Sequence, residues 1–532
     1  MYYENKIWIG NSGDQKICIL PQMSNRHGMI CGATGTGKTI TLKVLAESFS
    51  EAGVPVFLAD VKGDLAGMCS PGRDSEDMQK RIERFGLRAA GFSYEAYPTT
   101  FWDVYGEMGM PLRTTVSEMG PLLLSRILGL NSTQSDLLTI LFKIADDEGL
   151  LLIDTKDLKS MLTYVSEHAS EYSSTYGNIA KASVNAIIRA IVSLESEGAD
   201  QFFGEPALSI TDWFMPGAGG KGTIQVLDCQ KLIHSPSMYA TFLLWMLSEL
   251  FEVLPEVGDQ EKPKMVFFFD EAHMLFDDAP KALLSKIEQV VKLIRSKGVG
   301  IFFVTQNPRD IPDGVLAQLG NKIEHALHAY TPAEQKAAKA AAQSFRENPA
   351  FDTYKTLLEL GVGEALVSVL DEKGVPTVVE RVNILPPRSL MGALDDGERE
   401  RQMKGNMLYS RYNDYFDRDS AYEFLQRLKA EAVQEEAPAP EEEEAPVQTA
   451  AAAKKTGRTS SSSKASQKKD KDSLSYHAHK AAKSAATTTG GTVGREVGKA
   501  LGNSIGGKFG KTLGGNVGAS LGRSIMGVFF RG

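Results

Sequence analysis

One short segment near the start of the chain limits its possible folds more than any other. It reads Gly32-Ala-Thr-Gly-Thr-Gly-Lys-Thr39, and it lies between a short apolar run ending at Cys31 and a stretch of helical period from Ile40 to Phe49. This order of strand, glycine-rich turn and helix is the pattern of a P-loop. The segment therefore predicts an α/β unit in which the turn follows the end of a strand.

The residue types in this turn suit the phosphates of a nucleotide. Glycines allow consecutive backbone N–H groups to turn inward around phosphate oxygens, and the next helix presents the positive end of its dipole. The residues expected to form this cradle are Gly32, Ala33, Thr34, Gly35, Thr36 and Gly37. Lys38 would reach the β and γ phosphates, and the Thr39 hydroxyl would be a ligand of Mg²⁺. We therefore expect ATP and Mg²⁺ to bind here.

A second apolar run supplies the carboxylates that a P-loop needs. Met265 to Phe269 is a strand-sized run that ends in Asp270-Glu271. An acidic residue at the end of a nearby strand helps to hold Mg²⁺ in P-loop proteins, and we expect Asp270 to do so. Glu271 would act as the general base that polarises the attacking water. The structural alternative is that this pair only begins a helix.

A third apolar run, Val299 to Val304, leads into Thr305-Gln306. If this strand is a neighbour of the one before Asp270, it brings an uncharged polar group to the same edge of the sheet. Gln306 could then sense the γ-phosphate or orient the water. Glutamine is also common at strand ends for ordinary hydrogen bonding, so the role depends on the strand order.

The wider pattern predicts an α/β protein with a RecA-like P-loop core and a mostly parallel sheet. Between Trp8 and about Ile384, short runs rich in Val, Ile and Phe alternate with stretches of helical period. Strands are expected at 28–31, 54–59, 222–227, 264–269, 299–305, 322–329 and 364–370. The core is expected in two parts, residues 1–110 and 206–390, on either side of an inserted helical subdomain at 111–205. Polar helices are expected at 391–430.

The C-terminal part has a different composition. Residues 431–488 form an acidic, then basic, stretch with too few apolar residues to fold, and we expect a disordered linker. In the tail at 489–532, an apolar residue followed by glycine recurs every fourth position from Val493 to Leu521. Such a glycine stripe on a helix permits close approach of a second backbone. Self-association, contact with a membrane surface and a tail with no defined partner all remain open.

Charge and hydropathy limit the partners and the location. The formal charge is −9, but residues 451–532 alone contain fifteen Lys or Arg and three Asp or Glu, so the rest of the chain is strongly acidic. If the chain forms a ring that binds DNA, Lys and Arg in the pore or in the basic tail would make the contact rather than the acidic outer surface. No run approaches the ~18 apolar residues of a membrane span, and the start of the sequence lacks signal-peptide features. We expect a cytoplasmic protein, with attachment to the periphery of the inner membrane as the alternative.

Taken together, the motifs resemble a known superfamily. The motifs are Gly32 to Thr39, Asp270-Glu-Ala-His273, Arg295-Ser-Lys-Gly-Val-Gly300, Thr305-Gln-Asn-Pro308 and Asp60-Val-Lys-Gly-Asp64. This set resembles the HerA and FtsK superfamily of ring-forming, DNA-pumping ATPases, and most of all the uncharacterised bacterial HerA-like proteins with a glycine-rich tail. The resemblance covers about residues 5–390. The segment before Gly28 is too short for the N-terminal β-barrel of HerA proteins.

The resemblance implies both a reaction and an assembly. It implies Mg²⁺-dependent ATP hydrolysis with Asp270 on the metal, Glu271 as base and Gln306 as sensor. It further implies that Arg295, eleven residues before Gln306, is an arginine finger that reaches the nucleotide of a neighbouring subunit. A homo-oligomer, in particular a hexamer, and a helicase-like DNA translocase follow from the same resemblance. From the residues alone, Arg295 could equally be a helix-end cation near the negative end of the dipole.

Other classes of protein fit less of the sequence. Asp270-Glu-Ala-His273 also spells the DEAH helicase motif, but a second motor domain with its signature arginines is not recognisable. Asn321-Lys-Ile-Glu324 has Glu where guanine recognition requires Asp, which argues against a GTPase. A nucleotide-dependent scaffold with little turnover would not need Glu271 and Gln306. The main alternative to a DNA translocase is an ATPase that remodels or assembles protein, or acts at a membrane surface, with no DNA substrate.

Overall fold

The computed structural model describes residues 1–258, 260–276 and 281–436, which excludes most of the predicted linker and the whole glycine-repeat tail. The strands are β1 (Tyr2–Tyr3), β2 (Lys6–Ser12), β3 (Gln15–Ile19), β4 (Gly28–Cys31), β5 (Val56–Asp60), β6 (Thr99–Asp103), β7 (Met110–Pro111), β8 (Ile224–Asp228), β9 (Met265–Phe269), β10 (Val299–Thr305), β11 (Asn321–His325), β12 (Glu364–Ser368) and β13 (Glu380–Ile384).

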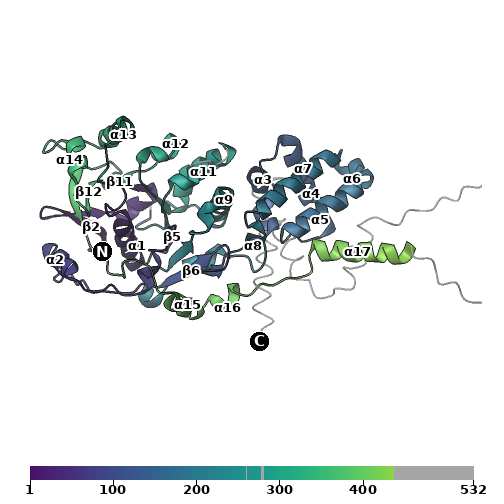
Figure 1. The fold of residues 1–532 in the computed structure, drawn as a ribbon, viewed down its shortest axis with the longest axis horizontal. Helices are drawn as coiled ribbons and strands as arrows, with labels where there is room; N and C mark the ends of the chain where they lie inside the picture. The colour runs from purple at the N-terminus through teal and green to yellow at the C-terminus, as the bar shows by residue number, and fades with distance from the viewer. Residues whose placement is uncertain (259, 277–280, 437–532) are drawn as a thin grey trace, which may run out of the picture. The chain divides into compact units, whose positions relative to one another are not determined.

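Helices occupy most of the remaining length (Figure 1). They are α1 (Lys38–Glu51), α2 (Glu76–Arg84), α3 (Val116–Ile127), α4 (Ser132–Glu148), α5 (Thr155–Glu167), α6 (Ala169–Tyr176), α7 (Lys181–Glu195), α8 (Ala199–Phe202), α9 (Pro236–Val253), α10 (His273–Phe276), α11 (Lys281–Ile294), α12 (Asp313–Leu316), α13 (Pro332–Gln343), α14 (Thr353–Glu359), α15 (Asp396–Lys404), α16 (Tyr409–Tyr412) and α17 (Ala421–Glu436). Among the residues described, no helix is both long enough and apolar enough to cross a membrane.

The strands form one sheet with a parallel centre and an antiparallel end. Their order is β1-β2-β13-β12-β11-β4-β10-β9-β5-β8-β6-β7, with β3 paired to β2. From β11 to β7 all neighbours are parallel, whereas β12, β13, β2, β3 and β1 pair antiparallel. The predicted α/β fold with a mostly parallel sheet is confirmed, and all seven predicted strands are present.

Helices cover the two faces of this parallel centre, which explains its unbroken apolar strands. On one face, Leu42, Leu45 and Phe49 of α1 join a core cluster with strand residues such as Phe268 and Phe302. Strand side chains alternate between faces, so the intervening residues point the other way. There, Phe57 of β5 stacks on Trp213 and on Phe242 of α9.

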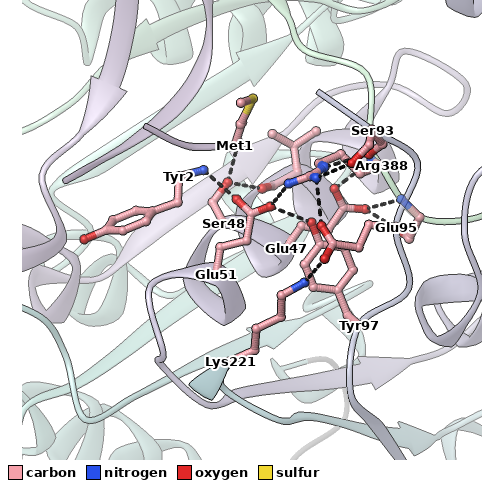
Figure 2. Close-up of polar contacts among 12 residues, drawn as sticks. Met1, Tyr2, Glu47, Ser48, Glu51, Ser93, Glu95, Tyr97, Lys221 and Arg388 are labelled. Carbon is pink, nitrogen blue, oxygen red and sulfur yellow. Dashed lines mark hydrogen bonds and ion pairs between the residues drawn. The ribbon is translucent and has the colours of Figure 1, made fainter. Parts of the chain in front are cut away.

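The helix after the P-loop is fixed along its polar stripe by a distant segment (Figure 2). Lys43, Glu47 and Glu51 lie on successive turns of α1, and all three contact residues 388–390. Glu47 Oε2 accepts from the backbone N–H of Arg388 at 2.8 Å, and Lys43 Nζ donates to the Leu390 carbonyl at 2.8 Å. The Arg388 guanidinium forms ion pairs with Glu51 and Glu95. We call residues 388–390 the strap, because their contacts fix α1 to the segment that follows β13.

The chain divides into two compact units. The first comprises Met1–Ser135, Ile153–Thr155 and Ala186–Arg418 and contains the whole sheet. The second comprises Asp136–Leu152, Lys156–Asn185 and the described residues from Asp419 onward, and it is helical. Within it, Asp157 Oδ1 accepts from the backbone N–H of Tyr422 at 2.8 Å, which anchors the start of α17 on α5. Thus the second unit takes the middle of the predicted insertion 111–205 together with part of the predicted polar helices.

Candidate active site

The P-loop lies at the carboxyl end of β4 and requires glycine at two positions. Gly32 has φ 149°, and a Cβ there would lie 2.5 Å from Cβ of His325 on the neighbouring strand β11. Gly37 has φ 118° at the N-cap of α1, where other residues would be strained. The Thr36 hydroxyl donates to the Ala33 carbonyl at 2.8 Å and closes the turn. The result is a loop of backbone N–H groups at the start of a fourteen-residue helix.

Lys38 is folded back over its own loop. Its ammonium donates to the carbonyls of Gly32 at 2.6 Å and Ala33 at 3.0 Å. The residue is buried, and burial lowers its pKa, while the nearby Glu271 carboxylate opposes that shift. Phosphate oxygens would be stronger acceptors for this cation than neutral carbonyls. Thr39 follows at the second position of α1, half-buried.

Asp270 follows β9 and has one carboxylate oxygen free for a ligand. Its Oδ1 accepts from the backbone N–H of Glu271 at 3.0 Å, whereas Oδ2 is buried and has no hydrogen-bond partner in the described structure. Burial is the main cause that raises the Asp270 pKa to about 6. A buried, unpaired carboxylate oxygen is costly unless a cation or donor meets it. Together with the Thr39 hydroxyl, this oxygen fits Mg²⁺, which prefers one or two protein oxygens beside phosphate and water.

Glu271 is held on both carboxylate oxygens. Oε1 lies 2.6 Å from the Lys62 ammonium, while Oε2 accepts from the Gln306 amide at 3.3 Å and lies 3.4 Å from His273 Nδ1. Burial opposes ionisation, but the hydrogen bond and charge of Lys62 outweigh it and lower the Glu271 pKa. The backbone has φ 45°, a region that costs about 1–3 kcal/mol for a residue other than glycine. Strain of this kind is typical of functional sites.

The strand order brings Gln306 to this carboxylate. Strand β10 lies between β4 and β9, so its carboxyl end faces both the P-loop and Asp270. The role expected for Gln306 required β10 to be a neighbour of β9, and these two strands pair in parallel. Gln306 is exposed at the end of β10, and its contact with Glu271 leaves its amide oxygen open to solvent or a ligand.

Arg295 is not part of this group. It is exposed in a short turn, Arg295–Lys297, that precedes β10, whereas the nucleotide residues follow the other end of the same strand. Seven strand residues span roughly 20 Å, so Arg295 lies at the opposite edge of the sheet from Gln306. An arginine there cannot serve the nucleotide site of its own subunit.

Two residues of the site were not assigned from the sequence. Lys62 lies in the turn after β5, which we noted only for its resemblance, and it contacts Glu271 across 209 residues of sequence. His325 lies against the P-loop at Gly32. Its Nδ1 is hydrogen-bonded to the Glu364 carbonyl and its Nε2 to the Thr41 hydroxyl, each at 2.8 Å. Burial lowers the His325 pKa to about 4, so this ring is neutral. Neither residue has a local sequence signal, because the partners of each lie far away in the sequence.

The comparison with known families decides where the chain belongs. A family described as "Helicase HerA-like C-terminal" matches residues 5–511. The chain belongs to this family. It is therefore a P-loop ATPase of the HerA and FtsK superfamily, as the motifs predicted.

Individual relatives are more distant from this HerA-like ATPase. A probable helicase of Methanocaldococcus jannaschii is 30% identical over 154 residues, which are 27% of this chain and 28% of that protein. The bacterial conjugative coupling protein TrwB has a TM-score of 0.48 at 13% identity, covering 74% of this chain and 92% of that one. VirB4 of Thermoanaerobacter pseudethanolicus has a TM-score of 0.44 at 17% identity, covering 72% and 98%.

The structure also explains the segment that resembles a guanine-recognition motif. In this HerA-like chain, Asn321–His325 is strand β11 itself, rather than a loop after a strand. The Asn321 amide donates to the carbonyls of Met23 and His27, and its oxygen accepts from the backbone of Leu370. All of its hydrogen-bonding groups are used within the fold. Asn321 therefore has a structural role and does not read a base.

Proposed function

We propose that this HerA-like ATPase uses Mg²⁺-dependent ATP hydrolysis to translocate DNA. The observation that carries the proposal is the helicase family match across residues 5–511, in a chain whose site contains every group that hydrolysis needs from one subunit. The body of the chain is acidic and would repel DNA from its outer surface, which limits where DNA could bind. DNA would then contact basic side chains inside a ring.

Each residue of the site has a separate role in hydrolysis. Lys38 leaves the carbonyls of its own loop and binds the β and γ phosphates of ATP. Thr39 and Asp270 would hold Mg²⁺, which supplies positive charge beside the phosphates. Glu271 accepts a proton from the attacking water, and Gln306, which contacts Glu271 at 3.3 Å, orients the same water.

The location of Arg295 supports a ring. An exposed arginine at the far edge of the sheet is available to a neighbouring subunit, where it would neutralise charge on the transferred phosphoryl group. We infer a homo-oligomer, and a hexamer in particular, in which each site is completed in trans. We place this ring in the cytoplasm. Residues 489–532, which lie outside the described structure, are the candidates for self-association or for contact with a membrane surface.

Steady-state ATP hydrolysis tests this function. We would measure it with the purified full chain, with and without single- and double-stranded DNA, at several salt concentrations and with EDTA as the test of metal dependence. Glu271→Gln is the blank, because an amide cannot accept the proton, and it should bind ATP without turnover. Stimulation by DNA that weakens as salt is added would support a translocase. Hydrolysis indifferent to DNA would instead favour an ATPase that acts on protein or at a membrane.

A further inference from the structure

Lys62 stands out because it is the cation closest to the general base and has no role in the scheme above. Its ammonium lies 2.6 Å from Glu271 Oε1. The Lys62 side chain is 44% exposed, whereas that of Glu271 is 5% exposed. A pair with one partner so exposed adds little to stability, so stabilising the fold is a weak explanation for the contact.

The turn that presents Lys62 is built to hold its position. Asp60, the last residue of β5, accepts from the backbone N–H groups of Gly63 at 2.7 Å and Leu65 at 3.0 Å. Gly63 has φ 78°, and a Cβ there would lie 2.8 Å from the Gln230 amide. Since β5 pairs in parallel with β9, this turn meets the Asp270–Glu271 segment at the same edge of the sheet. The backbone is therefore fixed, whereas the long and partly exposed lysine side chain can change partners without moving the turn.

The contact also blocks the base. A carboxylate needs an available oxygen to take a proton from water. In this structure Lys62 occupies Oε1, and Gln306 and His273 occupy the surroundings of Oε2. Lys38 is likewise engaged by carbonyls of its own loop. Lys38 thus has neutral carbonyls where phosphate oxygens would be the stronger acceptors, and Lys62 has a carboxylate that a phosphate oxygen could replace as a charged acceptor.

We propose that Lys62 is a further catalytic residue for hydrolysis, which pairs with Glu271 until ATP binds and then contacts the γ-phosphate. On ATP binding, Lys62 moves from Glu271 Oε1 to the γ-phosphate, and the base becomes free to accept a proton from water. ADP has no γ-phosphate, so Lys62 stays on Glu271. The proposal rests on the proposed function only through the assignment of Glu271 as the base.

A double-mutant cycle tests the exchange directly. The four proteins are the wild type, Lys62→Met, Glu271→Gln and the double variant, and each is titrated with a fluorescent non-hydrolysable ATP analogue and with the matching ADP analogue. In Glu271→Gln, ATP no longer has to break the Lys62–Glu271 ion pair. We therefore expect the ATP analogue to bind about tenfold tighter, which corresponds to the free energy of one charge-assisted hydrogen bond. Adding Lys62→Met should remove that gain. Binding of the ADP analogue should be the same in all four.

Kinetics of the single variants give an independent readout. Lys62→Met should lower kcat about tenfold with KM changed less than about threefold, because the exchanged contact matters mainly after ATP has bound. Lys62→Arg should recover most of kcat, since it keeps the charge. The matched control is Lys231→Met, because Lys231 follows the neighbouring strand β8 and pairs with Glu107 instead. It should behave as wild type.

Two results would overturn the proposal, and they are distinguishable. Additive effects in the cycle, or equal losses for the ATP and ADP analogues, would show that Lys62 does not exchange partners, even if Glu271→Gln is inactive. Full hydrolysis by Glu271→Gln would instead remove the base on which the exchange depends.

Discussion

The Lys38 ammonium lies 2.6 Å from the carbonyl oxygen of Gly32, six residues earlier in the same loop. The loop therefore binds its own lysine in the position from which that lysine would contact phosphate. This arrangement keeps a buried cation satisfied without nucleotide, and it means that ATP replaces an existing contact instead of meeting a free charge.

Replacing Lys38 should abolish nucleotide binding. Lys38→Ala removes the only residue expected to contact two phosphates by charge, so we expect affinity for ATP to fall at least ~100-fold. Isothermal titration calorimetry measures the effect. Lys80→Ala is the control, because Lys80 is an exposed lysine that pairs with Glu76 on α2. Binding of ATP by Lys38→Ala at wild-type affinity would contradict the assignment of the P-loop.

The parallel centre of the sheet was predictable because burial on both faces leaves an unbroken apolar run. β4 and β10 were predicted with the bounds that the structure shows, and β5, β8 and β9 within two residues. Of the antiparallel end only β12 was predicted, at 364–370, and β1, β2, β3 and β13 were not. β13 reads Glu380-Arg-Val-Asn-Ile384, in which polar and apolar residues mix in a short run, and β1 to β3 are equally short or mixed.

The candidate site was predictable only where a local motif carries the chemistry. The P-loop, Asp270 and Glu271 each follow an apolar strand, so the sequence alone identifies them as site residues. Lys62 did not, since its importance comes from the pairing of β5 with β9, which no local pattern reveals. The bounds of the helical insertion, the role of the tail and the cytoplasmic location stay predictions.

Arg295 should act on the neighbouring subunit. Arg295→Ala is expected to assemble normally but to hydrolyse ATP about 10³-fold more slowly, the loss typical of a missing arginine finger. Mixing it with Lys38→Ala should restore part of the activity, because some interfaces then combine an intact P-loop with an intact Arg295. Lys297→Ala is the control, since Lys297 lies in the same turn over the Phe251 ring. Absence of rescue at every mixing ratio would rule out action in trans.

The strap on α1 should stabilise the ATPase unit. Arg388 and its partner Glu51 are both largely buried, so Arg388→Ala would leave the Glu51 and Glu95 carboxylates without their shared cation. We expect a loss of about 3 kcal/mol in the free energy of unfolding, measured in urea. Arg381→Ala is the matched control: Arg381 is more exposed and pairs with Glu364, so the cost should stay below about 1 kcal/mol. Equal losses in the two variants would contradict a special role for the strap.

Glu324 should make stability depend on pH. It is buried beside Cys31 beneath the P-loop, one of its oxygens has no hydrogen-bond partner in the described structure, and burial is the main cause that raises its pKa to about 8. A carboxyl whose pKa is higher in the folded than in the unfolded state contributes most stability below the unfolded value, near 4.5, and loses it as the pH rises toward 8.

The matching variant is Glu324→Gln, which is neutral at every pH. The difference in Tm between this variant and the wild type should grow in favour of the variant between pH 5 and pH 8 and level off above, as followed by circular dichroism. Glu359→Gln, at an exposed position on α14, is the control for the general effect of removing a carboxylate. A Tm difference that does not change with pH would mean that the pKa of Glu324 is not raised in the folded protein, and would contradict the prediction.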